Sequence, residues 1–416
     1  MCEKEDEMKK IMILGAGQYQ VPIIEAAKKM GLYTIAISPV GPYPGLSLAD
    51  KVYNIDVRDE STILTIARAE CIDGVLTDQT DIAVRTVAFV AEKMGLPGIG
   101  YDTAKLFTDK SLMRAKTQEL GFPTIENTVA TTMGEAQAFF KRCRGRAIIK
   151  PVDNQGSRGV YLIDSCRELE ARFFRAMEYS PARQVIIEQY ITGREFEVDS
   201  ILVNGYEKTL MYADTDLYNI PNVFASKTRL YPSVAEKNTI EKLLKLNHDI
   251  VTEFGLSQGF THNEYIQDSE TGEIYLIEAA ARGGGSFISS HIGQLQTGLN
   301  TSEFIVKLAL GEVREMPDFE TAQCHCGYVT FYLPEGEVIG MEGVAKVKLL
   351  PYVKKHSLDD IYLGLKTGSF SDKTARNVII LSAESREDID RKIREIRDAL
   401  KISVRTRRGV EGPVWE

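Results

Sequence analysis

The sequence has no hydrophobic run near the ~18 residues that a membrane-spanning helix needs, and its first residues, Met1 to Glu7, are polar and acidic. We therefore expect neither a membrane span nor a secretory signal. Its six cysteines are scattered through a chain of 416 residues. This usage is typical of a protein kept reduced, and it predicts a cytoplasmic location.

The sequence also lacks an excess of positive charge, low-complexity tracts and internal repeats. Its net charge is −9, whereas a nucleic-acid partner requires a basic face. A small anionic ligand in a local basic pocket remains compatible with this charge. The composition, 44% hydrophobic and 26% charged, is ordinary for a globular protein, and the length predicts two or three domains.

Strands and helices alternate in the first hundred residues. Apolar strands are expected at 10–14, 33–37 and 74–77, with helices at about 21–30 and 81–94. This alternation predicts an N-terminal α/β domain with a doubly wound parallel sheet, residues 1–105.

A glycine-rich turn, Gly15 to Gly17, follows the first strand. It resembles a dinucleotide-binding fingerprint, but Gln20 replaces the third glycine and no acidic residue follows the second strand. NAD binding is therefore not favoured. The turn can still cradle an anion or a substrate, because it precedes a helix.

The pattern changes after about residue 106. We expect an α+β domain over 106–317, and a small C-terminal α+β domain over 318–416. The expected helices are 109–120, 132–142, 235–253, 300–309 and 386–400, and the expected strands are 147–152, 160–164, 185–190, 196–203, 327–333, 344–350 and 375–382.

Two glutamates stand on facing strands of a predicted hairpin. Residues 260–268 and 273–280 alternate apolar and polar positions around a turn that ends in Gly272. With the loop at 270–272, Glu264 lies opposite Glu278, with Cβ atoms roughly 4.5–5.5 Å apart. Two carboxylates this close repel unless a cation lies between them, and a divalent ion with oxygen ligands is the usual solution. Mg²⁺ prefers one or two carboxylates plus nucleotide phosphates, which indicates ATP.

Other segments add basic and phosphate-binding candidates. Lys150 ends an apolar strand and needs an anionic partner. The loop after it offers Gly156, Ser157, Arg158 and Gly159 to phosphate oxygens, although a plain β-hairpin remains an alternative.

Two further segments are weak evidence for a nucleotide site when each is taken alone. Lys110 starts a helix capped by Thr108 or Asp109. The strand that ends at Glu188 passes into Gln189, Tyr190 and Ile191, whose backbone could read an adenine edge. Glu195 follows seven residues after Glu188 and could accept ribose hydroxyls.

The order of these elements resembles the ATP-grasp superfamily over roughly 108–310. The flanking regions resemble the outer domains of its carboxylase, carbamoyl phosphate synthetase and L-amino-acid ligase branches. The resemblance implies ATP and Mg²⁺, or Mn²⁺, bound by Glu264 and Glu278, with Lys110 and Lys150 on the α and β phosphates. It also implies that the 155–159 loop covers the transferred phosphoryl group, that Glu188 lies near the adenine amino group, that Glu195 holds the ribose, and that Arg282 meets the γ-phosphate.

One position departs from the family pattern. The family usually carries asparagine two residues after the second metal glutamate, and this chain has Ala280. One metal ligand is therefore missing, and water or a substrate carboxylate could fill its place.

Several residues keep two interpretations. His262 shares the metal face with Glu264 and is a candidate catalytic residue, with His291 somewhat behind it. Residues 226–229 could border a substrate pocket or lie on a solvated face. Cys324 and Cys326 flank a histidine, but the alternating strand and the absence of a second ligand pair favour a structural role over zinc.

The implied activity is ATP-dependent ligation of a carboxylate to an amine through an acyl phosphate, with both substrates small molecules. The catalytic candidates are Arg282, Lys150 and His262. The alternatives are a carboxylase or carbamoyl-phosphate-type enzyme of nucleotide metabolism, and a nucleotide-binding regulatory protein without turnover. Related enzymes are often dimers, so a homodimer is a candidate state.

Overall fold

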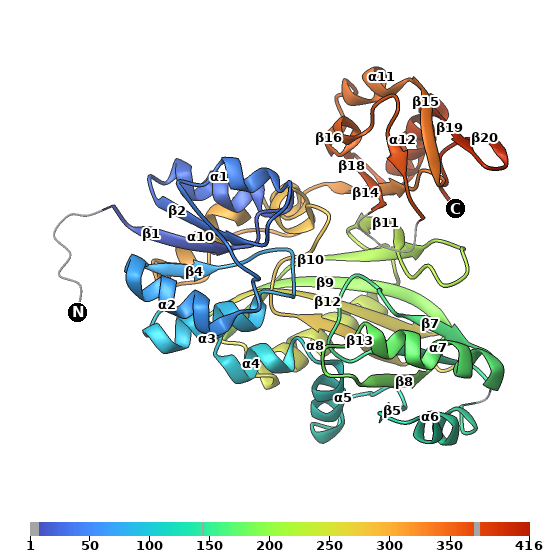
Figure 1. Cartoon of the computed structure of the whole chain (residues 1–416), viewed down its shortest axis with the longest axis horizontal. Helices are drawn as coiled ribbons and strands as arrows, with labels where there is room; N and C mark the ends of the chain where they lie inside the picture. The colour runs from blue at the N-terminus through green and yellow to red at the C-terminus, as the bar shows by residue number, and fades with distance from the viewer. Residues whose placement is uncertain (1–7, 144, 370–374) are drawn as a thin grey trace.

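The computed structural model describes residues 8–143, 145–369 and 375–416. The polar start of the chain, with Cys2, lies outside the described residues. Three regions are evident in Figure 1: the N-terminal domain in blue, a central region in green and yellow, and a C-terminal region in orange and red. None of the helices within the described ranges combines the length and apolar character needed to cross a membrane.

The N-terminal domain is built on a four-stranded parallel sheet in the order β3-β2-β1-β4. Its strands are β1 (Lys10–Leu14), β2 (Tyr33–Ser38), β3 (Lys51–Asn54) and β4 (Gly74–Leu76), and its helices are α1 (Val21–Lys29), α2 (Glu60–Glu70), α3 (Val84–Met94) and α4 (Tyr101–Leu106), with a 3-10 turn, η1 (Pro44–Ser47). The predicted parallel α/β architecture is confirmed.

Both faces of β1 are covered, which explains its continuous apolar sequence. Ile11 and Ile13 pack in a cluster with residues of α1 and of a later helix, α10 (Thr301–Ala309). Met12 and Leu14 pack on the other face with residues of α2 and α3. The N-terminal sheet thus recruits a helix from more than 200 residues later in the chain (Figure 1).

The central region contains a small antiparallel sheet in the order β5-β8-β6-β7. Its elements are β5 (Asn127–Ala130), β6 (Ala147–Pro151), β7 (Tyr161–Ile163) and β8 (Val185–Gln189), with helices α5 (Lys110–Glu119), α6 (Met133–Phe140) and α7 (Cys166–Glu178). Asp109 caps α5, accepting hydrogen bonds from the backbone of Ser111 and Leu112, and Thr132 forms a capping box with Glu135 at α6.

A long antiparallel sheet runs through the molecule in the order β13-β12-β9-β10-β11-β14-β18-β16. Its strands are β9 (Gly193–Val203), β10 (Tyr206–Leu217), β11 (Ser226–Tyr231), β12 (Gly259–Asp268), β13 (Ile274–Ala280), β14 (His325–Phe331), β16 (Val353–His356) and β18 (Asn377–Ala383). Helix α8 (Lys237–Glu253) contributes Leu243, Ile250 and Val251 to a core cluster with Val198 and Tyr265 from this sheet.

The C-terminal region continues that sheet and adds a second one, in the order β17-β15-β19-β20. Its elements are β15 (Gly336–Glu342), β17 (Lys366–Thr367), β19 (Lys401–Thr406), β20 (Gly409–Glu411), α11 (Val344–Lys348), α12 (Arg386–Ala399) and η3 (Leu358–Asp360). Because β14 pairs with β11, strands on both sides of residue 317 share one sheet. We retain the division at 105 and 317 as a proposal.

The strand predicted at 344–350 is wrong, because this segment forms helix α11. Val344 and Val347 are its buried residues, and their spacing of three places them on one helical face. Gly343 precedes the helix with φ 78°, and a Cβ there would meet the carbonyl oxygen of Ala399. This glycine permits the tight entry that a strand interpretation did not anticipate.

Candidate functional site

A cavity of about 150 Å³ lies between the small antiparallel sheet and the long sheet. Ile148 and Lys150 line it from β6, and Ile266 and Glu278 line it from the β12–β13 hairpin. The apolar side chains provide flat walls, while charged groups gather among the lining residues. This combination suits a ligand with an apolar ring and an anionic tail.

The hairpin has the predicted register. Glu264 pairs with Glu278 across β12 and β13, and also with Glu197 on β9. Each hairpin glutamate already contacts a basic side chain: Lys110 Nζ lies 2.6 Å from Glu278 Oε1, and Arg229 pairs with Glu264. The expected repulsion between the carboxylates is therefore partly offset by cations of the chain itself.

Lys150 has a carboxylate partner inside the protein. Its Nζ lies 2.6 Å from Glu188 Oε2, and Arg114 Nε lies 2.7 Å from Glu188 Oε1. All three side chains are buried. Burial raises the pKa of Glu188, but Arg114 and Lys150 outweigh it and hold the pKa at about 2. Burial and the neighbouring cations lower the pKa of Lys150, against the opposing effect of Glu188.

The glycine loop after β6 contacts the N-terminal domain. Gln155 accepts a hydrogen bond from the backbone N–H of Asp81 at 2.7 Å, and its Nε2 donates to Thr80 Oγ1 at 3.2 Å. Ser157, with φ 58°, donates its hydroxyl to the carbonyl of Phe224 at 2.9 Å. The loop therefore bridges the segment after β4 and the β10–β11 connection.

A second cavity of about 490 Å³ adjoins the first. Both cavities share Gln155, Gly156, Arg158, Ser226, Arg229, Glu264 and Glu278 among their lining residues. His262 and Arg282 line the second cavity only, beside Tyr19 and Asp81 from the N-terminal domain. The hairpin acid pair therefore stands where the two cavities meet.

Arg282 forms a two-point ion pair with Asp81. Its Nε and Nη2 each lie 2.8 Å from one carboxylate oxygen of Asp81, and both side chains are largely buried. Burial lowers the pKa of Arg282, but Asp81 outweighs that effect and raises it. Arg282 is therefore charged, and its planar fork is fixed by a residue of another domain.

His262 belongs to a buried polar network on β9, β11 and β12. Arg229 Nη1 lies 3.0 Å from His262 Nε2, and His262 Nδ1 lies 2.9 Å from Asp199 Oδ1. Because arginine only donates, Nε2 accepts and Nδ1 carries the hydrogen that Asp199 receives. Burial and then Glu197 raise the pKa of Asp199 well above its usual range.

The family model described as the ATP-grasp domain matches residues 144–290, which span the glycine loop, the adjacent strands and the acidic hairpin. The chain contains an ATP-grasp domain.

Two curated relatives resemble much of the chain. A formate-dependent phosphoribosylglycinamide formyltransferase of Wolinella succinogenes is 24% identical over 305 residues, which cover 72% of this chain and 75% of that protein. An L-arginine-specific L-amino acid ligase of Bacillus subtilis is 22% identical over 320 residues, which cover 73% of this chain and 76% of that protein.

Solved structures show the same fold over almost the whole chain. An L-amino acid ligase from Bacillus licheniformis has a TM-score of 0.84 at 22% identity, covering 97% of this chain and all of that one. A phosphoribosylglycinamide synthetase from Anaerococcus prevotii has a TM-score of 0.75 at 19% identity, covering 95% of this chain and 99% of that one. At these identities the likeness shows that the chain shares the fold of these two structures.

Most of the sequence-predicted site residues lie along the first cavity of the ATP-grasp domain. They are Lys110, Lys150, Gly156, Ser157, Arg158, Glu188, Gln189, Tyr190, Ile191, Glu195, Glu264 and Glu278. Gly159 does not line either cavity. It has φ 76°, and a Cβ there would meet Tyr179 and Pro151, so its position reflects turn geometry and packing.

The remaining sequence candidates divide between the site and the scaffold. Ser226 and Arg229 line both cavities, whereas Lys227 pairs with Glu416. His291 lines neither cavity, and burial followed by Lys355 lowers its pKa to about 4. Gln20 accepts from the N–H of Gly17 and donates to the carbonyl of Asp78, so its side chain closes part of the turn expected to cradle an anion.

Cys324 and Cys326 line neither of the two cavities. Gln296 Nε2 lies 3.2 Å from the buried Cys326 sulfur and 2.5 Å from the Cys324 carbonyl oxygen. Within the described part of the chain, the one group of three or more His, Cys, Asp or Glu side chains close enough to share a metal ion is Glu197, His262 and Glu264.

Sequence reasoning missed several residues that shape the site. Asp81, Arg114, Glu197 and Asp199 hold the functional candidates through ion pairs and hydrogen bonds. Tyr19, Gln79 and Arg376 line the second cavity from distant segments. No local motif marks these residues, since their partners lie on other elements.

Proposed function

We propose that this protein is an ATP-dependent carboxylate–amine ligase that forms an amide through an acyl phosphate and releases ADP and phosphate. The main observation in support of this proposal is that two cavities meet at Glu264 and Glu278, beside the glycine loop and within reach of Lys110. One cavity suits a nucleotide, and the larger one suits the substrates. A shared acidic junction between them is where a phosphoryl group would be transferred.

The relatives support this class of chemistry. They include a formate-dependent formyltransferase, an L-arginine-specific L-amino acid ligase and an alanine–anticapsin ligase. Formate and amino acids share a carboxylate. Activating a carboxylate by phosphorylation is therefore a reaction that suits all of these substrates.

We assign the residue roles that the resemblance to the ATP-grasp superfamily implies, and the cavity lining and the charges support them. Lys110 and Lys150 hold nucleotide phosphates, and the loop from Gln155 to Gly159 covers them. Backbone groups of residues 189–191 read the adenine edge, with Glu188 beside the adenine amino group and Glu195 at the ribose. Arg282 neutralises the transferred phosphoryl group, and His262 supports the substrate side of the acid pair.

The oxygen donors Glu264 and Glu278 suit Mg²⁺, with Mn²⁺ as a substitute, because they face each other beside the phosphate-binding loop. A divalent ion held there would supply positive charge to the nucleotide phosphates. Lys110 must then loosen its contact with Glu278 and turn towards phosphate oxygens. Its long, flexible side chain allows this movement.

Water exclusion is the second requirement, because an acyl phosphate hydrolyses readily. The Gln155 contacts with Thr80 and Asp81 close the glycine loop against the N-terminal domain.

Amide formation follows the acyl phosphate. The amine attacks the acyl carbon, phosphate leaves with the electron pair of the broken C–O bond, and the amine loses one proton. Positioning of the substrates and stabilisation of the developing charge account for most of the rate acceleration in this type of reaction.

A substrate panel with an ADP-release assay tests the proposal. We expect ADP production to require Mg²⁺ and both a carboxylate and an amine, with pairs of L-amino acids giving the strongest stimulation. Release of ADP with no dependence on an amine would contradict ligation. Binding of Mg-ATP without ADP production from any pair would instead support a regulatory nucleotide-binding protein.

A second candidate function is formylation or carboxylation of a nucleotide-pathway amine. The observation that favours it is the formyltransferase relative, which covers a share of the chain comparable to that covered by the amino acid ligase. Formate or bicarbonate as the stimulating carboxylate would select this candidate in the same panel.

The cytoplasmic location and the homodimeric state expected from the sequence remain predictions.

The ion pair between Asp81 and Arg282 leads to a separate prediction. Asp81→Asn removes the charge that fixes the Arg282 fork while keeping a similar shape. We expect kcat to fall about 10-fold to 100-fold, because a small misplacement of a catalytic group is costly. The KM for ATP should change little, since Asp81 does not line the first cavity.

The matched control is Asp102→Asn, which breaks an exposed ion pair with Lys105 on α4. This control should leave both kinetic constants unchanged. A rise in the KM for ATP with unchanged kcat would assign Asp81 to nucleotide binding instead of to the positioning of Arg282.

A further inference from the structure

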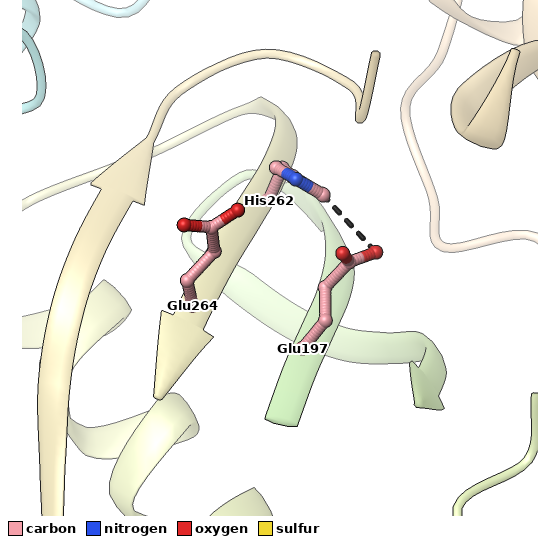
Figure 2. Close-up of side chains that lie close together, drawn as sticks. All are labelled: Glu197, His262 and Glu264. Atoms are coloured by element: carbon pink, nitrogen blue, oxygen red, sulfur yellow. Dashed lines mark ion pairs between the residues drawn. The ribbon is translucent and has the colours of Figure 1, made fainter. Parts of the chain in front are cut away.

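Arg229 occupies the centre of a cluster that otherwise has the spacing of a metal site. Glu197, His262 and Glu264 extend from β9 and β12 towards one another (Figure 2), and their potential ligand atoms all lie within 4.8 Å of one another. Arg229 Nη1 contacts Glu197 and lies 3.0 Å from His262 Nε2, and its Nη2 contacts Glu264. One guanidinium therefore contacts all three groups.

The Arg229 charge is permanent. Its side chain is buried and in contact with Glu197, His262 and Glu264. Guanidinium groups do not lose their proton in proteins. A divalent ion held by Glu197, His262 and Glu264 Oε1 together would have to share these groups with the guanidinium of Arg229, and the two positive charges would repel each other.

The second strand of the hairpin, β13, lacks a metal ligand at residue 280. Ala280 pairs with His262 across β12 and β13 and follows Glu278 by two residues, so it faces the same side of the sheet. Its methyl group offers no ligand atom for a metal ion. Ala280 therefore contributes no metal ligand on β13, while Arg229 places a fixed cation on the other side of Glu264.

We propose that Arg229 is a built-in cation that replaces the charge of a second divalent ion, so that the site takes one divalent ion together with the nucleotide. Glu264 and Glu278 would hold that ion. Arg229 lines both cavities, so its charge is available to the phosphoryl group during transfer as well as to the acids. This inference rests on the proposed nucleotide-dependent function.

Counting bound Mn²⁺ tests the inference without relying on activity. The full-length protein is saturated with the β,γ-imido analogue of ATP and titrated with Mn²⁺, and bound ions are counted by electron paramagnetic resonance. We expect one nucleotide-dependent Mn²⁺ per chain. Two ions would overturn the inference and leave the proposed function standing. No Mn²⁺ and no analogue bound would remove the proposed function itself.

Two variants separate the effect of Arg229 from the effect of Ala280. Ala280→Asn restores the missing donor, and we expect it still to bind one ion because Arg229 remains. Combining Ala280→Asn with Arg229→Ala should raise the count to two. Two ions in the single variant, or one ion in a double variant that keeps its circular dichroism spectrum, would overturn the role of Arg229. If the double variant does not fold, the counts of the wild type and of Ala280→Asn still decide.

Discussion

Replacing Glu278 with glutamine is expected to lower kcat for ADP release by about 100-fold to 1000-fold, the usual cost of removing one charge-stabilising group from a transition state. Glu278 lines both cavities, stands opposite Glu264 and contacts Lys110. Glutamine keeps the size of the side chain but not its charge. The divalent ion that neutralises the phosphates would then lose one of its two opposed carboxylate ligands. Steady-state ADP release at saturating substrate measures the effect.

Glu270→Gln is the matched control for this prediction. Glu270 lies in the turn of the same hairpin and is exposed, so the same change there removes a charge without touching either cavity. Its activity should equal that of the wild type. Full activity in Glu278→Gln would show that the hairpin acids do not serve phosphoryl transfer, and the proposed site would have to be abandoned.

The hairpin could be predicted because its information is local. Alternating residues on both sides of a glycine turn leave one register in which the apolar side chains share a face, and Glu264 pairs with Glu278 as expected. Caps and periodicity likewise predicted α5, α6 and α12 within one or two residues of their observed ends. These features depend on residues only a few positions apart.

The ion pairs of the site could not be predicted, because they join distant segments. Arg282 and Asp81 are 201 residues apart, Arg114 and Glu188 are 74 apart, and Arg229 and Glu264 are 35 apart. Each partner has an ordinary local sequence. Only the sheet order, in which β9 lies between β10 and β12, places Arg229 from β11 within reach of Glu264.

Lys150 shows how a correct argument from local sequence can leave out one of the partners of a charged side chain. A charge at the end of an apolar strand needs an anion, and the sequence suggested a nucleotide phosphate. The structure supplies Glu188 from the neighbouring strand β8, paired in register with β6. The strands β10 and β11 were missed entirely, although they carry Arg229 and complete the long sheet.

Removing the Glu188 carboxylate should lower the free energy of unfolding by about 3 kcal/mol or more, the cost of breaking a buried ion pair by taking away one partner. Glu188→Ala leaves Arg114 and Lys150 buried together without their shared anion. Lys150 can relieve part of this by losing its proton, because its pKa is already lowered. Arg114 cannot, since guanidinium groups keep their charge. Chemical denaturation at pH 7 measures the loss.

The pH dependence of that loss identifies its cause. The folded pKa of Glu188 is about 2, below its ordinary value of 4.5, so its stabilising charge is fully present above about pH 4.5 and disappears as pH falls towards 2. The difference between the wild type and Glu188→Ala should therefore be largest near neutrality and shrink through that window. Glu119→Ala, which breaks an exposed pair with Lys116, should cost less than about 1 kcal/mol. Equal losses in the two variants would mean that the buried arrangement of Arg114, Lys150 and Glu188 does not stabilise the ATP-grasp domain.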